Sequence, residues 1–294
     1  MKIGIIGSPQ RCTAWEQHMR GIQGIKEVIL ARELTELNGL DAVVVVPEEN
    51  HTGYDRIIHA IRQNLHVFVV APLPREKSSA ERIYHLAEEA NVVLQFSHWP
   101  SISPASQWMI KQVPSPNFIQ VNRELLNSRF RELDTTFEDL WVDELAFCLK
   151  WVNSNVKSVD AKLATLETGN NADHPENEQN VAIHIHLRFD NGATAGLYVS
   201  RTARDNRFKR VGSDKYHVVE SDVLENAVRL GRLNNQGHLF FERNTFDPSQ
   251  AAELSIHHFV KAIRLKQPSL FNSYDVFQTA RTREIIKKRL RRFS

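Results

Sequence analysis

The amino-acid sequence predicts an α/β protein whose N-terminal part is a doubly wound parallel sheet. Four apolar runs have the length and composition of buried strands, and they cover residues 1–7, 41–46, 66–70 and 92–96. Between the last three runs, apolar residues recur three or four positions apart, which is the spacing of a helix that packs one face on a core. Strands that alternate with helices in this way favour a parallel sheet with helices on both faces.

The segment between the first two of these strands is short. It holds a predicted helix, a predicted strand and one predicted helical turn, at residues 13–22, 27–31 and 34–37. A complete half of a doubly wound fold needs about 60 residues here, at ordinary helix, strand and loop lengths. We therefore expect a truncated Rossmann-like sheet, shortened between Ala31 and Asp41.

The turn after the first strand lacks most of a phosphate-binding signature. In dinucleotide-binding domains the pattern G-x-G-x-x-G lets the backbone approach a pyrophosphate and lets the helix pack closely on the strand. Here the first glycine is Gly7, but Pro9 and Cys12 stand in the second and third glycine positions. Pro9 also has no N–H to donate to a phosphate oxygen. We expect no bound cofactor; if NAD or NADP binds, Gly7 and Ser8 are the residues to hold it.

One acidic residue remains as a candidate for a ribose contact. Dinucleotide-binding domains place such a residue after the second strand, about 20 residues past the glycines. Glu33 stands near this place, beside Arg32. Either Glu33 binds a ribose, or both residues are solvated charges at a strand end.

Composition limits the classes of protein that remain. A chain of 294 residues exceeds what one hydrophobic core usually supports, so we expect two domains. The net charge of +2 gives no reason to expect nucleic-acid binding, and no apolar run is long enough to span a membrane. Two cysteines fit a reducing compartment and complete no zinc pattern. We expect a cytoplasmic protein without a metal site.

Residues 41–73 resemble a known family. The run DAVVVVP, then Asn50 and His51, then a helix and the run HVFVVAPL correspond to D-A-V-x-I-A-T-P, an Asn, a His and H-V-x-x-E-K-P-L in the Gfo/Idh/MocA oxidoreductases, named for glucose-fructose oxidoreductase and inositol dehydrogenase. Residues 181–203, which read as a hairpin around an Asn-Gly turn, and predicted helices at 252–265 and 273–289 extend the resemblance.

The resemblance implies the domain organisation. It places a Rossmann-like domain at residues 1–115 and an α+β domain with a large, mostly antiparallel open sheet at residues 116–294. It also implies a homodimer that forms through this open sheet. Pro47 and His51 join Gly7 and Ser8 as the cofactor-binding positions that the resemblance implies.

The catalytic positions of the family are occupied by other residue types. The resemblance places its E-K-P lysine at Ala71, its histidine base at Glu144 and its aspartate at Phe147, with Trp151 matching the family's tryptophan. Ala71 and Phe147 cannot transfer a proton. Glu144 is either a base whose pKa is raised by desolvation or an exposed helix glutamate.

Further candidates belong to a ligand pocket. His98 and Trp99 follow the strand at 92–96, at the carboxyl edge where open α/β sheets bind ligands. Together with Asn50 and Glu144 they are the candidate pocket residues; the alternative is that His98 and Trp99 form a packed interdomain linker.

His184 and His186 alternate with aliphatic residues and so share one face of a strand. They either begin a metal site or belong to a polar sheet face used for subunit contact.

Two functions remain open. The first is an oxidoreductase-fold protein that has lost NAD(P)-dependent chemistry and acts as a small-molecule sensor, a regulatory subunit or a partner subunit. The second is an active NAD(P)-dependent oxidoreductase with an altered site and a sugar-type or biliverdin-reductase-like substrate. Biliverdin reductases resemble the same family and also lack the E-K-P lysine, although they keep the glycine fingerprint.

Overall fold

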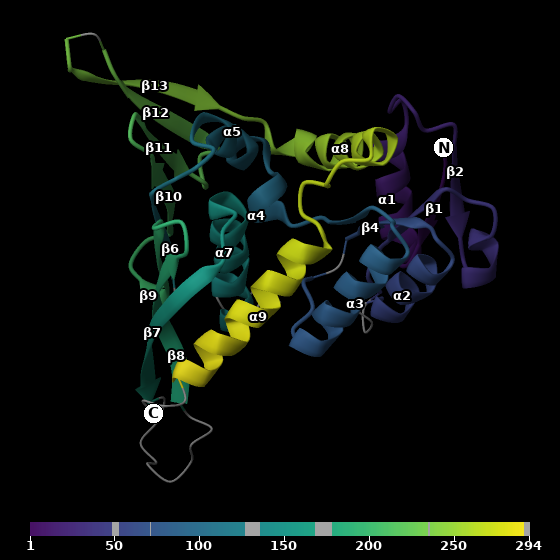
Figure 1. Cartoon of the computed structure of the whole chain (residues 1–294), viewed down its shortest axis with the longest axis horizontal. Helices are drawn as coiled ribbons and strands as arrows, with labels where there is room; N and C mark the ends of the chain where they lie inside the picture. The colour runs from purple at the N-terminus through teal and green to yellow at the C-terminus, as the bar shows by residue number, and fades with distance from the viewer. Residues whose placement is uncertain (49–52, 71, 127–135, 168–177, 235, 291–294) are drawn as a thin grey trace. The chain divides into compact units, whose positions relative to one another are not determined.

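The computed structural model describes residues 1–48, 53–70, 72–126, 136–167, 178–234 and 236–290, which form two compact units (Figure 1). The first unit contains Met1–Pro104 and Asp247–Ala280, and the second contains Ala105–Phe246 and the chain from Arg281 onward. The sequence places the boundary at residue 115 and keeps the C-terminal helices in the second domain. In the structure the first unit instead ends at Pro104, and it also includes Asp247–Ala280.

The first unit is built on a five-stranded parallel sheet in the order β2-β1-β3-β4-β5. Its strands are β1 Lys2–Ile6, β2 Glu27–Ala31, β3 Ala42–Val45, β4 His66–Val69 and β5 Leu94–Phe96. Every residue of β3 is buried, as expected for a strand covered on both faces. The strand order changes direction between β1 and β3, which makes their carboxyl ends the switch point of the sheet. The predicted doubly wound parallel sheet is confirmed.

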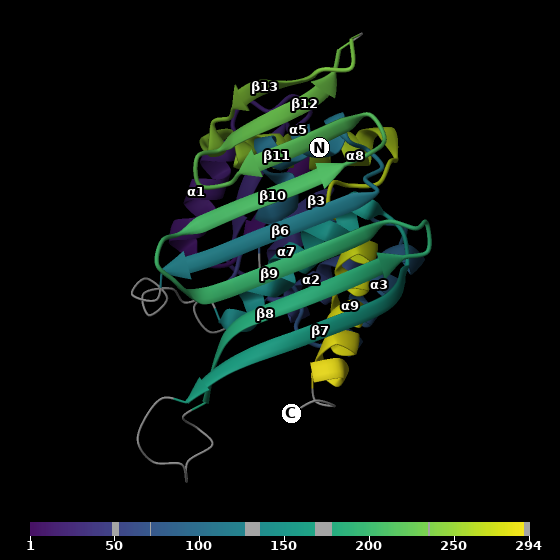
Figure 2. The same cartoon turned by 90° about the vertical axis from the view of Figure 1, so that its left-hand side faces the viewer.

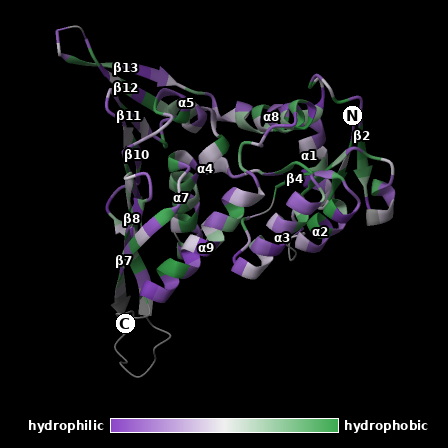
Figure 3. Ribbon diagram, viewed as in Figure 1, coloured by the Kyte–Doolittle hydropathy of each residue, from purple (hydrophilic) through white to green (hydrophobic). Residues whose placement is uncertain are grey.

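Helices cover both faces of this sheet. They are α1 Pro9–Met19, α2 Tyr54–Arg62, α3 Lys77–Glu89 and α8 Ala251–Leu265. α1 packs beside α8, and α2 packs beside α3 (Figure 1); right-handed crossovers from a reversing strand order put the two pairs on opposite faces. In Figure 3, α8 carries both hydrophobic and hydrophilic residues, as does a helix with one face on a core.

The elements predicted between the first two buried strands are confirmed. α1 begins at Pro9 rather than at residue 13, because proline suits the first position of a helix. β2 has the predicted bounds, and the 3-10 helix η1, Leu34–Leu37, is the predicted helical turn.

The second unit contains an eight-stranded sheet in the order β13-β12-β11-β10-β6-β9-β8-β7. Its strands are β6 Phe118–Leu126, β7 Val156–Glu167, β8 Glu178–Phe189, β9 Thr194–Ala203, β10 Arg207–Ser213, β11 His217–Asp222, β12 Ala227–Leu233 and β13 Leu239–Thr245. β6 and β9 run parallel, and the other neighbouring pairs that the structure describes are antiparallel. The mostly antiparallel sheet that the resemblance implies is therefore confirmed.

One face of this sheet packs on α7, Phe137–Val152. α7 begins at a capping box in which Thr136 and Asp139 each bond the other's backbone N–H. In Figure 2 the sheet lies in front of α7. The other helices in the described residues are α4 Trp99–Ile102, α5 Pro104–Gln112, the 3-10 helix η3 Pro248–Gln250 and α9 Ser273–Leu290. No helix in the described ranges is long and apolar enough to cross a membrane.

Candidate functional site

The carboxyl ends of β1 and β3 form the edge where this type of sheet binds ligands. Gly7 follows β1 with a φ of +143°, a conformation that favours glycine. A Cβ atom at this position would collide with the backbone carbonyl of Val46. Glycine is therefore required here by the close approach of two backbone segments, whether or not a nucleotide binds.

The N-terminus of α1 offers few groups to a phosphate. Ser8 is the N-cap residue and its side chain makes no capping hydrogen bond, while Pro9 takes the first helical position and has no N–H. Cys12 is 4% exposed and packs in the core of the unit. Burial raises the pKa of the Cys12 thiol, which keeps it neutral. This agrees with a space-filling role for Cys12 at the position of the third fingerprint glycine.

Acidic residues follow β2, but the one that contacts the end of the strand is not the predicted Glu33. Arg32 and Glu33 are both exposed, as the solvated-charge interpretation expects. The carboxylate that contacts the end of β2 belongs to Glu36, whose Oε2 accepts a hydrogen bond of 2.8 Å from the backbone N–H of Arg32. Sequence reasoning missed Glu36 because it lies inside the helical turn η1 rather than at the strand end.

The segments after β3 and β4 carry several of the candidate residues. Pro47 is half-buried, whereas Asn50, His51 and Ala71 lie outside the described residues. Next to Pro47, Glu48 forms an ion pair of 2.8 Å with Arg56 on α2. Glu48 and Arg56 were not singled out in the sequence, which carries no local signal for a pair eight residues apart across a turn.

His98 is packed within the first unit rather than exposed to a pocket. It is 4% exposed, its Nδ1 lies 2.9 Å from the Ser101 hydroxyl, and its ring stacks on Phe271 with centroids 4.3 Å apart. Its neighbour Trp99 is 46% exposed. The burial of His98 agrees with the packing that the linker interpretation expects, whereas Trp99 is accessible and does not share it.

Glu144 occupies the interior of the second unit. The expectation of an exposed helix glutamate is wrong, because this side chain is 0% exposed. Its two carboxylate oxygens accept hydrogen bonds of 2.8 and 3.0 Å from Nε and Nη2 of Arg210 on β10. Nη1 of Arg123 lies 3.6 Å from Glu144 Oε1, and Arg210 Nη1 donates to the Ser106 hydroxyl at 2.9 Å. Both oxygens of Glu144 are thus held by a buried bidentate ion pair.

The Phe147 ring packs against Arg210 of the same ion pair. Its ring is fully buried, and the Arg210 guanidinium carbon lies 4.3 Å from the ring centroid, which is cation–π geometry. Trp151 lies 5.3 Å from Phe147, and its indole N–H donates to the Val113 carbonyl at 2.8 Å. Glu144, Phe147 and Trp151, the positions on α7 that the resemblance matches to the family's helix, therefore belong to one packed cluster.

A role for Arg210 was not predicted, although the residue pattern of β10 contains a signal for it. Along β10, Phe208, Arg210 and Gly212 alternate with Lys209 and Val211, and the first set includes the buried residues. An arginine at a buried position of a strand requires a buried partner, so its position in the alternation points to an internal carboxylate.

Asp143, next to Glu144 on α7, is a carboxyl group that titrates near neutral pH. Burial raises the pKa of Asp143 to about 7, and the Glu144 carboxylate adds to this effect, against the opposing charges of Arg123 and Arg210. Nothing in the sequence distinguishes Asp143 from the other acidic residues of α7.

His184 and His186 lie on the open face of the large sheet, while Ile183, Ile185 and Leu187 are buried beneath it. In the register of the sheet, His184 is opposite Lys162 and Tyr198. Across the described ranges, no three His, Cys, Asp or Glu side chains come together as metal ligands. The observed face is polar and mixed in charge.

Comparisons with known proteins place the fold. No protein-family model matches the chain, and no curated protein is found to be similar. Solved structures match over its whole length. The UDP-N-acetylglucosamine 3-dehydrogenase GnnA from Acidithiobacillus ferrooxidans has 18% identity, a TM-score of 0.78 and coverage of 100% of this chain and 98% of the other.

Two further structures agree with this result. An NAD binding oxidoreductase from Klebsiella pneumoniae has 15% identity and a TM-score of 0.80, with coverage of 100% of this chain and 98% of the other. Levoglucosan dehydrogenase, in a complex with NADH and levoglucosan, has 13% identity, a TM-score of 0.73 and the same coverage. The chain therefore has the fold of these three proteins.

Proposed function

We propose that this chain is a member of the Gfo/Idh/MocA oxidoreductase family that has lost NAD(P)-dependent dehydrogenation. It acts instead as a small-molecule sensor, a regulatory subunit or a partner subunit. The buried ion pair between Glu144 and Arg210 is the observation that carries this proposal.

Dehydrogenation of a sugar hydroxyl needs a base that takes the hydroxyl proton as the hydride leaves. The resemblance puts that base at Glu144, whose two oxygens both accept hydrogen bonds from Arg210. For Glu144 to act on a substrate, Arg210 would have to remain buried without its partner, which costs about 3–5 kcal/mol. Neither Ala71 nor Phe147 can replace the lost proton transfer.

The switch point of the sheet supports the same proposal. A phosphate at the start of α1 would meet Pro9 instead of a glycine N–H. The one fingerprint glycine that remains, Gly7, is accounted for by its contact with Val46. Its presence is therefore not a sign of nucleotide binding, and no NAD(P) cofactor is expected.

A nucleotide titration tests the proposal. Purified protein is titrated with NADH and NADPH while the fluorescence of the nicotinamide is followed. We expect no saturable change up to about 1 mM nucleotide, which corresponds to a binding free energy weaker than about −4 kcal/mol. Saturable binding in the micromolar range would overturn the proposal.

An active NAD(P)-dependent oxidoreductase is the second candidate. The observation that favours it is the whole-chain similarity to solved dehydrogenases, one of them in a complex with NADH. Its substrate would be of the sugar type or of the biliverdin-reductase type. Micromolar NADH binding together with substrate-dependent oxidation or reduction of the nucleotide would establish it.

A further inference from the structure

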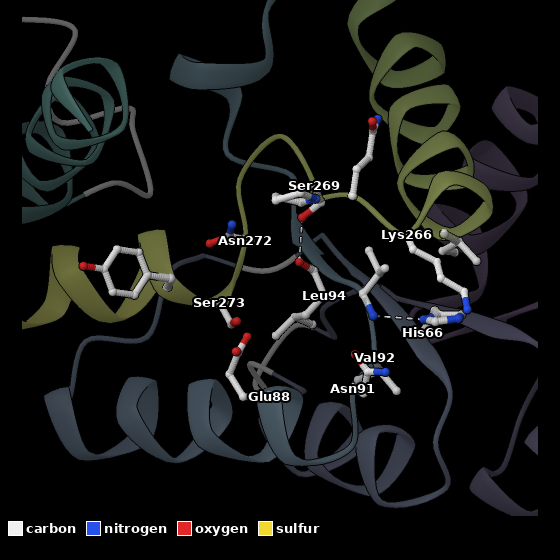
Figure 4. Close-up of a pocket in the computed structure, with 14 residues that line it drawn as sticks. His66, Glu88, Asn91, Val92, Leu94, Lys266, Ser269, Asn272 and Ser273 are labelled. Carbon is white, nitrogen blue, oxygen red and sulfur yellow. Dashed lines mark hydrogen bonds between the residues drawn. The ribbon is translucent and has the colours of Figure 1, made fainter. Parts of the chain in front are cut away.

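A cavity of about 380 Å³ lies in the first unit, at the edge of the parallel sheet opposite to Gly7 (Figure 4). It is formed by the amino ends of β4 and β5, the turn between α3 and β5, and the connection from α8 to α9. Ligand sites of open α/β sheets lie at the carboxyl edge, so this cavity is separate from the switch point. Its volume lies in the range of small-molecule pockets.

Hydrogen bonds tie the walls of the cavity together. The backbone N–H of Val93 donates to Nδ1 of His66 at 2.9 Å, and the Ser269 hydroxyl donates to the Leu94 carbonyl at 2.8 Å (Figure 4). Asn272 caps α9, since its Oδ1 accepts from the N–H of Asp275 at 3.0 Å. The walls are therefore held before any ligand arrives, which lowers the entropic cost of binding.

One end of the cavity carries hydrogen-bond donors. His66 Nδ1 accepts a hydrogen bond, so in the neutral ring the proton is on Nε2. Burial lowers the pKa of His66, which favours this neutral form. In Figure 4 the Lys266 ammonium lies on the same side as His66. An imidazole N–H and an ammonium together suit a carboxylate.

The other end carries acceptors. In Figure 4 the Glu88 carboxylate lies beside the buried Ser273, with Asn91 on the wall between the two ends. Within the part of the chain that the structure describes, neither Glu88 nor Lys266 forms a side-chain ion pair or hydrogen bond. A carboxylate next to a hydroxyl suits an ammonium group.

We propose that this cavity binds a small zwitterion of the amino-acid type. The ligand carboxylate lies against Lys266 and His66, and its ammonium group lies against Glu88 and Ser273. One cation and one anion at opposite ends match a ligand with one charge of each sign, whereas a phosphate ester would leave Glu88 facing negative charge. The proposal concerns a different edge of the sheet from the nucleotide question and does not depend on its answer.

Calorimetric titration with the common L-amino acids tests the proposal on the full chain. We expect at least one of them to bind with a Kd below about 1 mM. The N-acetyl and the carboxamide derivatives of the tightest ligand each lack one charge, and we expect each to bind about tenfold more weakly or worse. Absence of binding by every amino acid at about 10 mM would overturn the proposal.

Two pairs of variants locate the binding. Lys266→Gln and Glu88→Gln should each weaken binding about tenfold. The controls are Lys261→Gln on α8, the helix that Lys266 follows, and Glu89→Gln beside Glu88 on α3; both residues lie outside the cavity lining, and we expect these variants to keep the native Kd. In addition, Lys266→Gln should leave the affinity of the carboxamide derivative unchanged, because that ligand has no carboxylate. Equal effects of the cavity variants and their controls would contradict the proposed site.

Discussion

A buried ion pair between Glu144 and Arg210 occupies the place in the second unit where the resemblance puts a catalytic base. Arg210 is 2% exposed and sits between the Glu144 carboxylate, the Ser106 hydroxyl and the Phe147 ring. Each contact uses a different property of the guanidinium: its charge, its fork of N–H donors and its flat face. Removal of either charge is therefore expected to destabilise the core.

Glu144→Gln is expected to lower the free energy of unfolding by about 3–5 kcal/mol, because it leaves the Arg210 charge buried without a counter-ion. Urea unfolding measures this change. The matched control is Glu138→Gln on the same helix, whose carboxylate is 30% exposed and pairs with Arg283 and Lys287. We expect a loss of about 1 kcal/mol there, since partly exposed pairs contribute less. Equal losses in the two variants would show that the internal pair has no special role.

Asp143 gives the stability of the protein a specific pH dependence. Its pKa is raised from 3.8 to about 7 in the folded state, so the folded chain keeps a proton that the unfolded chain releases. The stability that this proton provides is fully present below pH 3.8 and is lost as the pH rises to about 7.

Asp143→Asn should therefore be more stable than the native chain at pH 8, with a difference that shrinks toward pH 4. Urea unfolding at several pH values checks this, with Asp160→Asn, an exposed change on β7, as the control. A difference between Asp143→Asn and the native chain that stays constant with pH would contradict the expectation.

Among the secondary-structure elements, the turn from β1 to α1 is set by the close packing of its backbone on the backbone at Val46. β1 ends against β3, and the turn to α1 passes so close to Val46 that no side chain fits at Gly7. α1 then begins with a proline and packs Cys12 into the core. These features stabilise the sheet, and none of them needs a ligand.

Gly7→Ala is expected to destabilise the fold by more than about 2 kcal/mol, from its backbone conformation together with the collision at Val46. Gly21→Ala is the matched control, because Gly21 has a φ of +85° but no atom near its missing Cβ. We expect a loss of about 1 kcal/mol there from the backbone alone. Thermal unfolding of both variants measures the difference, and equal losses would show that the contact with Val46 yields.

At the scale of the whole molecule, the open face of the eight-stranded sheet is the surface proposed for a homodimer. The face mixes charged side chains with a few large apolar ones, among them Phe118, which is 45% exposed. Such a mixture is typical of protein interfaces outside their cores.

Light scattering should give a mass near twice the 33.8 kDa of the chain. Phe118→Asp should shift it toward the monomer, because it buries an unpaired charge in the interface. Leu224→Asp, an exposed residue in the turn between β11 and β12, is the control and should leave the mass unchanged. A monomeric native chain would contradict the proposed dimer.

Local patterns explain why much of the fold could be predicted. The runs at 42–46 and 67–70 are apolar at every position, and the stripe of Ile57 and Ile61 has helical spacing, so strand and helix types follow from neighbours in the sequence. The alternation of His184 and His186 with aliphatic residues likewise gave the correct face of β8. In each case the residues that decide the structure lie within one turn or one pleat of each other.

The candidate site was only partly predictable. The replaced fingerprint glycines and the assignment of Ala71, Glu144 and Phe147 come from comparing residue types with the motif that the resemblance supplies, and this assignment stays a prediction. The alternative of an exposed helix glutamate is wrong for Glu144, and its partner Arg210, which lies 66 residues away, could not be predicted. Two charged residues that pair across a long stretch of chain produce no periodic pattern of residue types in the sequence.

Local patterns in the sequence predicted the parallel sheet of the first unit and the order of its elements, and the resemblance implied the mostly antiparallel sheet of the second unit. Only the tertiary structure decided that Glu144 is held by Arg210, that Asp247–Ala280 returns to the first unit, and that His66 and Lys266 line one cavity. The physical reason is the range of the interactions. Backbone hydrogen bonding and amphipathic periodicity act between near neighbours, whereas buried charges and cavities are made by segments that meet only after the chain has folded.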